Sequence, residues 1–167
     1  MIAPYIGLAV TGTLAAARCR GFLLWWVAFD TVATVALKLI WVTWHVYAPL
    51  WAVAEPVRAA LGVGVALTLS RPRWPVYVAA IAVHAVALDV SPDRWPGTWL
   101  QVEEQAVALV ALMCGLSMMG SCKKRLHVAV AALFLGTAAA YYCVPGNPEV
   151  RVWLMWWQCA CYVAMLF

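Results

Sequence analysis

Two charged residues stand inside an apolar stretch of the sequence. Asp30 and Lys38 both fall in the run 22–47, whose other members are mostly aliphatic and aromatic. A charge at membrane depth is costly, so its presence predicts a functional role or a specific partner. On a helix the two residues lie about 12 Å apart along the axis, too far for direct pairing. Asp30 therefore needs a partner on a neighbouring helix or along a water-filled path, whereas Lys38 can extend toward the membrane surface.

His84 is the third residue that could contribute to such a path. It lies in the middle of AIAVHAVALD, five positions before Asp89. Histidine exchanges protons near neutral pH, and it also serves as a hydrogen-bonded packing residue on apolar helices. One hypothesis is therefore a polar path for ions or protons that involves Asp30, Lys38 and His84. The alternative is that these side chains join helices to one another.

The remaining candidates do not indicate an enzyme. Glu103 and Glu104 open an apolar run after Pro96 and Gly97, where the N-terminus of a helix favours acidic residues. The sequence contains no GxSxG, HExxH, Walker or dinucleotide-binding motif. Its six cysteines include no CxxC pair. We predict a non-enzymatic protein without a metal or another cofactor.

The composition indicates the solvent in which these residues act. Of the 167 residues 66% are hydrophobic and 11% are charged, and the mean hydropathy is +0.87. Soluble domains are about 45–50% apolar and about 25% charged. The chain is therefore expected to be an integral membrane protein, and a large soluble domain is excluded. The net charge of +4 comes from small clusters between apolar runs, which argues against nucleic acid as a partner.

Seven apolar segments follow one another, separated by short stretches of Pro, Gly and charged residues. A transmembrane helix needs roughly 17–25 residues, so three segments are long enough to span a bilayer. The pair 57–70 and 74–88 forms either two thin spans or a re-entrant hairpin. We predict a single domain over 1–167, an all-α polytopic transmembrane helical bundle with six to seven spans. The segments are 2–17, 22–47, 57–70, 74–88, 99–119, 126–144 and 152–167, of which 22–47, 99–119 and 126–144 are the long ones.

The charged residues divide between alternate connections. If all seven segments cross, one side of the membrane holds only basic residues and the other side most of the acidic ones. The positive-inside rule then places the N-terminus outside or in a lumen and the C-terminus in the cytosol. A re-entrant hairpin would bury the charges of its RPR turn, which is costly. The basic topology determinants are Arg18, Arg20, Arg71, Arg73, Lys123, Lys124 and Arg125, and the opposite side holds Glu55, Arg58, Asp89, Asp93, Arg94, Glu103, Glu104, Glu149 and Arg151.

Small residues and tryptophans indicate how the helices pack and where they end. Small side chains four positions apart let helix backbones approach closely, within the bundle or between copies of the chain. Most of the eleven tryptophans lie near predicted helix ends, where an indole favours the headgroup zone. The predicted packing residues are Ala60, Gly62, Gly64, Ala66, Ala132, Gly136 and Ala140, and the predicted belts contain Trp25, Trp26, Trp41, Trp44, Trp51, Trp74, Trp95, Trp99 and Trp153.

Both ends of the sequence run directly into apolar segments. Met1 begins the first run without a polar leader, and the last segment, 152–167, has no charge after it. We expect processing boundaries at both ends, with the natural polypeptide continuing past Phe167 into the cytosol.

The last segment also carries a resemblance to a protein family. RVWLMWWQCACYV, residues 151–163, and the Trp, Cys, Val and Ala texture of the chain resemble the hydrophobic nonstructural segments of hepacivirus and pegivirus polyproteins. In that family an Arg and a Trp-Trp-rich span precede a cytosolic protease domain. The resemblance implies a lumenal start, several spans, a cytosolic continuation and residence in the endoplasmic reticulum membrane. It assigns no protease residue to this chain, because the catalytic domain would lie beyond Phe167.

Three functional hypotheses follow from the sequence. The first is a non-enzymatic membrane protein that anchors or organises a larger membrane-bound assembly through helix packing, as a segment of a viral polyprotein under the resemblance. Its partners would be the lipid bilayer and other membrane proteins or further copies of itself. The second is a small, viroporin-like channel or transporter whose polar path involves Asp30 and Lys38. The third is a membrane-embedded enzyme, which would need several polar residues to converge on one cavity.

Overall fold

The computed structural model describes residues 2–44, 48–70, 74–90, 99–119, 124–143 and 148–167, except for the side chains of 41, 44, 48–52, 88–90, 99–104, 143 and 148–151. Seven α-helices and no strand occupy this part of the chain, which confirms the all-helical prediction. The helices are α1 (Ala3–Arg18), α2 (Gly21–Trp44), α3 (Ala48–Leu69), α4 (Trp74–Val90), α5 (Trp99–Met119), α6 (Arg125–Cys143) and α7 (Pro148–Ala164).

The start of α3 differs from the prediction. Sequence patterning places the stretch before residue 57 in a connection, but α3 already begins at Ala48 and contains Pro56. A proline inside a helix removes one backbone hydrogen bond and crowds the preceding turn. The helix nevertheless continues, because Ala54 and Glu55 are buried against the rest of the bundle. The predicted connection was therefore wrong here, and Glu55 and Arg58 lie on a helix instead of outside the bundle.

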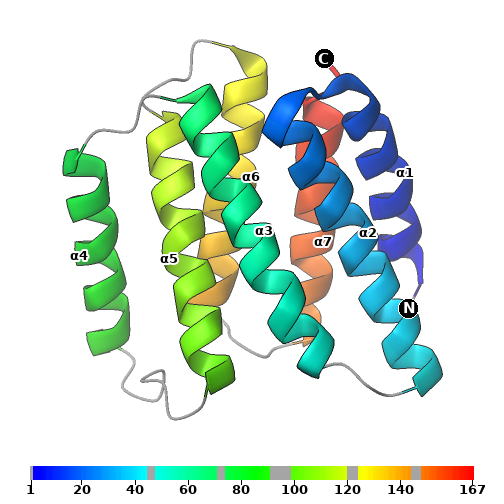
Figure 1. Cartoon of the computed structure of the whole chain (residues 1–167), viewed down its shortest axis with the longest axis horizontal. Helices are drawn as coiled ribbons and strands as arrows, with labels where there is room; N and C mark the ends of the chain where they lie inside the picture. The colour runs from blue at the N-terminus through cyan, green and yellow to red at the C-terminus, as the bar shows by residue number, and fades with distance from the viewer. Residues whose placement is uncertain (1, 45–47, 71–73, 91–98, 120–123, 144–147) are drawn as a thin grey trace.

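Six helices form a closed ring, and α4 lies outside it. Around the ring the neighbours are α1, α2, α3, α5, α6 and α7, and α7 closes the ring against α1 (Figure 1). Helix α4 packs against α5. Successive helices run in alternating directions, so the last residues of α1, α3, α5 and α7 share one end of the bundle (Figure 1).

The segments 57–70 and 74–88 correspond to two separate helices. With 22 and 17 residues, α3 and α4 both extend along the bundle in opposite directions (Figure 1). Each of the two segments therefore belongs to its own helix along the bundle. The connection 71–73 lies outside the described residues.

Two helices in the described part of the chain are long and apolar enough to cross a membrane. These stretches are Gly21–Ile40 in α2 and Arg125–Tyr142 in α6. Trp74–Ala87 and Gln105–Met119 are apolar but shorter. The criterion is length and composition, which the core helix of a soluble protein can also meet.

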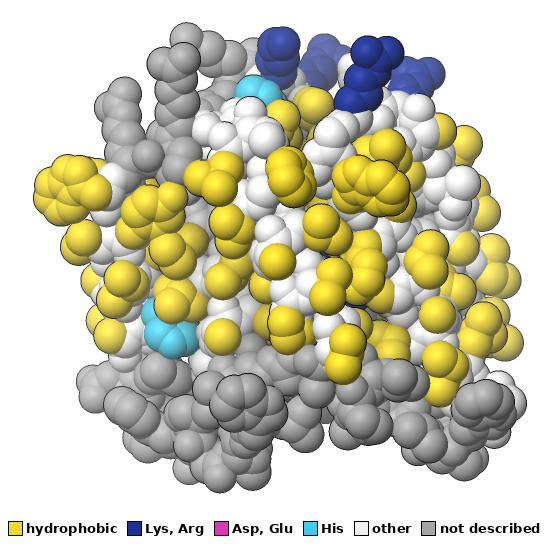
Figure 2. All heavy atoms as spheres, in the orientation of Figure 1, with side chains coloured by type: hydrophobic (Ala, Val, Ile, Leu, Met, Phe, Trp, Pro, Cys, Tyr) yellow, Lys and Arg dark blue, Asp and Glu magenta, His cyan; other side chains and the backbone are white. Residues whose placement is uncertain are grey.

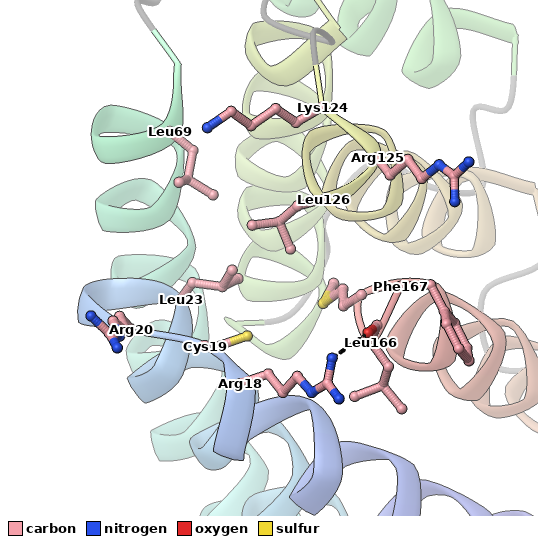
Figure 3. Close-up of a pocket in the computed structure, with 11 residues that line it drawn as sticks. Arg18, Cys19, Arg20, Leu23, Leu69, Lys124, Arg125, Leu126, Leu166 and Phe167 are labelled. Atoms are coloured by element: carbon pink, nitrogen blue, oxygen red, sulfur yellow. Dashed lines mark hydrogen bonds between the residues drawn. The ribbon is translucent and has the colours of Figure 1, made fainter.

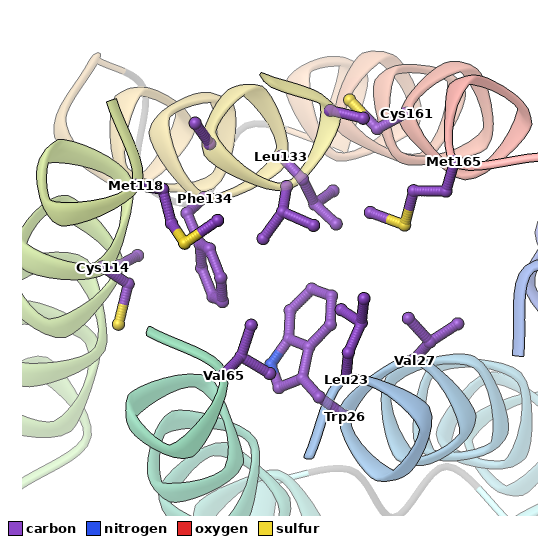
Figure 4. Close-up of a cluster of buried hydrophobic side chains, with 14 of the residues drawn as sticks. Leu23, Trp26, Val27, Val65, Cys114, Met118, Leu133, Phe134, Cys161 and Met165 are labelled. Atoms are coloured by element: carbon purple, nitrogen blue, oxygen red, sulfur yellow. The ribbon is translucent and has the colours of Figure 1, made fainter. Parts of the chain in front are cut away.

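Aromatic and aliphatic side chains from all six ring helices fill the interior. Trp26 is only 3% exposed, and its ring lies 4.9 Å from that of Phe134 on α6 (Figure 4). The prediction that Trp26 belongs to an interfacial belt was therefore wrong. Because neighbouring residues on a helix point about 100° apart, Trp25 faces outward while Trp26 faces the core. Trp25, Trp74 and Trp153 are exposed, and the other predicted belt tryptophans lie outside the described side chains.

At two of the predicted packing residues, a glycine leaves room for an aromatic side chain of another helix. A Cβ atom on Gly136 would lie 2.1 Å from Nε1 of Trp157, and one on Gly64 would lie 2.5 Å from the ring of Phe22. The Trp157 indole N–H donates to the Ala132 carbonyl at 3.1 Å, so the pair Ala132 and Gly136 seats an indole ring. Of the other predicted packing residues, Gly62 and Ala66 are buried, Ala140 is half-buried and Ala60 is exposed.

Candidate functional site

Three charged side chains meet inside the ring, where α2 faces α3. Arg58 Nε lies 2.7 Å from Oδ1 of Asp30, an ion pair without the alignment of a hydrogen bond. Arg58 Nη1 also donates to Oε1 of Glu55. Glu55 and Arg58 stand three positions apart on α3 and so share one face of that helix. The Asp30 side chain is fully buried, and Arg58 is 12% exposed.

Hydroxyl groups from three helices surround these charges. Tyr162 of α7 donates to Oδ2 of Asp30 at 2.5 Å, and Tyr141 of α6 donates to Oε2 of Glu55 at 3.3 Å. Arg58 Nη2 donates to Oγ1 of Thr34 on α2 at 3.0 Å. We call this set, Asp30, Thr34, Glu55, Arg58, Tyr141 and Tyr162, the Arg58 cluster. It joins α2, α3, α6 and α7.

The Arg58 cluster lies well inside the bundle. Asp30 comes nine residues after the first residue of α2, about 14 Å at 1.5 Å per residue, and Arg58 comes eleven residues before the end of α3, about 16 Å. Removing one member of a buried ion pair costs about 3–5 kcal/mol, because the other charge is left without compensation. The cluster can therefore hold four helices in one arrangement.

Acidic groups outnumber basic groups within the cluster. The described part of the site contains two carboxylates and one guanidinium. When both carboxylates are ionised the cluster carries one excess negative charge, which a buried site of low dielectric disfavours. One bound proton or one cation would balance it. The arrangement can thus lock helices together, and it also has the chemistry to exchange a proton.

Lys38 and His84 lie apart from this cluster. Lys38 Nζ sits 5.4 Å from the centre of the Tyr5 ring on α1, a cation–π contact. His84 Nδ1 lies 2.7 Å from the hydroxyl of Tyr142, which joins α4 to α6. The structure therefore does not bring Asp30, Lys38 and His84 together in one path. Each has its own partner on a neighbouring helix.

Five members of the cluster, Thr34 among them, were not candidates in the sequence. Glu55 and Arg58 flank Pro56, which marks a connection in the pattern, and Tyr141 and Tyr162 look like ordinary apolar-helix residues. A signal did exist, because AVAEPVRAALGV is apolar on both sides of its two charges. An Arg three positions after a Glu within such a stretch indicates an internal ion pair.

The described topology determinants gather at one end of the bundle. Figure 2 shows Lys and Arg side chains at this end above an apolar side wall. Arg18 and Arg20 come from the junction of α1 and α2, and Lys124 and Arg125 come from the start of α6. We call these four residues the basic end. Arg71, Arg73 and Lys123 lie outside the described residues.

No group of three or more His, Cys, Asp or Glu side chains that could hold a metal ion occurs within the described ranges. Comparisons with protein-family models, curated proteins and solved structures found no match for this chain.

Proposed function

We propose that this chain is a polytopic integral membrane module of seven helices that anchors or organises a larger membrane-bound assembly. The observation that carries the proposal is a distribution of side chains opposite to that of a soluble protein, with charged residues inside and large apolar residues outside. Asp30 and Glu55 are buried, while large aliphatic residues are exposed on the outer faces of several helices. In a bilayer the apolar outer surface meets lipid and the charges turn inward. Examples of the exposed residues are Val10, Val32, Val53, Val86 and Val128.

The orientation follows from the basic end. Under the positive-inside rule this end faces the cytosol, so the N-terminal end of α1 lies outside or in a lumen and the C-terminal end of α7 lies in the cytosol. The resemblance of residues 151–163, all of which belong to α7, supports the same orientation, in a viral polyprotein segment of the endoplasmic reticulum membrane.

The organising role rests on how the polar groups are used. The Arg58 cluster ties four helices together, and the contact between His84 and Tyr142 fixes α4 to α6. Polar residues that bond to one another across helices stabilise a fixed bundle. A fixed bundle with an apolar outer surface can present that surface to other membrane proteins or to further copies of the chain.

Alkaline extraction and cross-linking test this proposal. Membranes that contain the full chain are washed with carbonate at high pH, and a second sample is cross-linked within native membranes before extraction. We expect the chain to stay in the pellet and to appear in cross-linked species larger than its own 18.3 kDa. Release by carbonate would contradict the membrane-spanning part. Recovery of the monomer alone at every cross-linker concentration would contradict the organising part.

A proton-coupled transporter is the second candidate, favoured by the excess carboxylate of the Arg58 cluster. A proton that balances this charge could enter and leave as the helices move. In liposomes with an internal pH dye, proton flux that disappears with Asp30→Asn and persists with Lys38→Gln would support this function. Absence of flux in the wild-type chain would reject it.

A further inference from the structure

An open cavity with two kinds of lining lies at the basic end. Its volume is about 670 Å³, within the range of roughly 300–1,000 Å³ typical of ligand sites. Charged side chains come from the α1–α2 junction and the start of α6, and apolar side chains come from α2, α3, α6 and the C-terminal residues (Figure 3). The charged lining is Arg18, Arg20, Lys124 and Arg125, and the main apolar lining is Leu23, Leu69, Leu126, Met165, Leu166 and Phe167.

The charged lining favours an anion. Among the described residues, four basic side chains and no acidic side chain line the cavity. The Arg18 guanidinium donates to the Leu166 carbonyl at 2.8 Å, a bond that orients Arg18 but leaves its charge uncompensated. Like charges around one cavity repel one another, and a bound phosphate would relieve that repulsion with charge-assisted hydrogen bonds.

The apolar lining favours a ligand with a hydrocarbon part. Leu23 and Met165 are buried below the charged residues, and Leu69 and Leu126 are half-buried beside them. A small hydrophilic anion would leave the accessible surface of Leu69 and Leu126 in contact with water. An amphiphile would cover them with its first methylene groups, whose removal from water is favourable.

We propose that this cavity binds an acidic phospholipid, with the headgroup phosphate on the basic side chains and the start of an acyl chain against the leucines. The inference rests on the proposed function, which places the basic end at the level of the cytosolic headgroups, where anionic lipids are concentrated. Bound in this way, the lipid bridges the α1–α2 junction, α6 and the C-terminal residues.

Lipid titration of the full chain in a neutral detergent tests the proposal. The probes are dioleoyl phosphatidylglycerol, dioleoyl phosphatidylcholine and inorganic phosphate, with binding followed by native mass spectrometry at low ionic strength. The test variant combines Arg20→Gln, Lys124→Gln and Arg125→Gln and keeps Arg18, because Arg18 also bonds to Leu166. Lys38→Gln is the matched control, since it removes a positive charge outside the cavity.

We expect phosphatidylglycerol to bind much more tightly than phosphatidylcholine. Each basic residue near an anionic headgroup is worth about a factor of five, so the triple variant should bind phosphatidylglycerol on the order of 100-fold more weakly. Lys38→Gln should bind like the wild-type chain. Equal binding of both lipids, or unchanged binding by the triple variant, would overturn the proposal. Inorganic phosphate that displaces the lipid at comparable concentration would overturn the lipid assignment in favour of a soluble anion.

Two further variants separate binding from folding. Arg20→Lys with Arg125→Lys keeps the charges and should retain most of the binding, even if the triple glutamine variant folds poorly. Leu69→Gln should weaken phosphatidylglycerol while leaving the charged lining intact, and no loss with this variant would contradict the amphiphile. Carbonate extraction of the same chain reports on the proposed function separately, because lipid binding in detergent does not depend on topology.

Discussion

At the scale of single residues, Arg58 is the central member of the Arg58 cluster. It is the cation between two buried carboxylates, and it bonds to both α2 and its own helix. Replacing it leaves two acidic groups facing each other without compensation. Replacing one carboxylate, in contrast, leaves one positive and one negative charge.

Arg58→Met should therefore destabilise the protein more than Asp30→Asn does. We expect a loss of about 3–5 kcal/mol for Arg58→Met, the cost of an unpaired buried charge. The triple variant with Asp30→Asn, Glu55→Gln and Arg58→Met should recover part of it. The measurement is unfolding in detergent, followed by a thiol-reactive dye that reports on the buried cysteines Cys114 and Cys159.

Arg20→Met serves as the control for this series, because Arg20 is exposed at the basic end. It should change stability by less than about 0.5 kcal/mol. An Arg58→Met protein as stable as this control would show that the Arg58 cluster does not hold the helices together.

Only part of the Arg58 cluster could be predicted from the sequence. Asp30 could be selected because it is a charge within a long apolar run. Its need for a partner on another helix could be inferred from distance along the helix, but the partner could not be identified. Arg58 could not be identified as this partner, because Pro56 suggests that the helix has not yet begun. In the folded protein, burial of this part of α3 outweighs the local effect of the proline.

At the scale of elements, α4 is the helix with the least support. It lies outside the ring, packs against α5, and is joined to α6 by the hydrogen bond between His84 and Tyr142. Local stability in such a helix depends on few contacts, so it should open before the ring does.

Tyr142→Phe should release α4 without unfolding the ring. Loss of this hydrogen bond costs about 0.5–1.5 kcal/mol. Hydrogen exchange should therefore become roughly 2- to 10-fold faster in the amides of α4 and remain unchanged in α2 and α6. Equal acceleration in all helices would mean that α4 and the ring unfold as one unit.

The contact of α6 with α7 gives a second prediction at this scale. Gly136 has room for a side chain only if the Trp157 indole moves, since a Cβ atom would lie 2.1 Å from the indole nitrogen. Gly136→Leu should lower the free energy of unfolding by about 1–3 kcal/mol, the usual cost of overpacking. Ala139→Leu on the same helix is the matched control, because Ala139 faces outward and a larger side chain there meets no neighbour in the core.

Thermal unfolding in detergent measures both variants. A Gly136→Leu protein that unfolds at the temperature of Ala139→Leu would contradict the tight seating of the indole on α6.

Element type could be predicted well from the sequence, whereas element neighbours could not. Continuous apolar runs separated by Pro, Gly and charges indicated seven segments, and seven helices occupy the described residues. The ring order and the external position of α4 depend on contacts between distant residues, such as Trp26 with Phe134. No periodicity within one helix contains that information. The small residues Gly62, Gly64 and Gly136 gave partial information about neighbours. They indicated positions of close packing but not which helix packs there.

At the scale of the whole molecule, a basic end lies above an apolar side wall (Figure 2). The basic end gathers Arg18, Arg20, Lys124 and Arg125 from segments far apart in sequence, because the helices alternate in direction. If the bundle spans a bilayer, seven crossings place the two chain ends on opposite sides, with the basic end in the cytosol.

Single-cysteine labelling measures directly on which side of the membrane each chain end and the basic end lie. In a chain whose native cysteines are replaced by serine or alanine, one cysteine is added before Met1 in one protein, after Phe167 in a second, and at Arg20→Cys in a third. The native Cys19 is a poor reporter, because it is buried and burial raises the pKa of its thiol. The reagent is a membrane-impermeant maleimide applied to sealed vesicles of known orientation.

We predict that the cysteine after Phe167 and Arg20→Cys label only from the cytosolic side, and that the cysteine before Met1 labels only from the opposite side. Labelling of both termini from the same side would contradict the seven crossings. Labelling of all three positions from either side, together with release of the chain by carbonate, would contradict the membrane-spanning bundle itself.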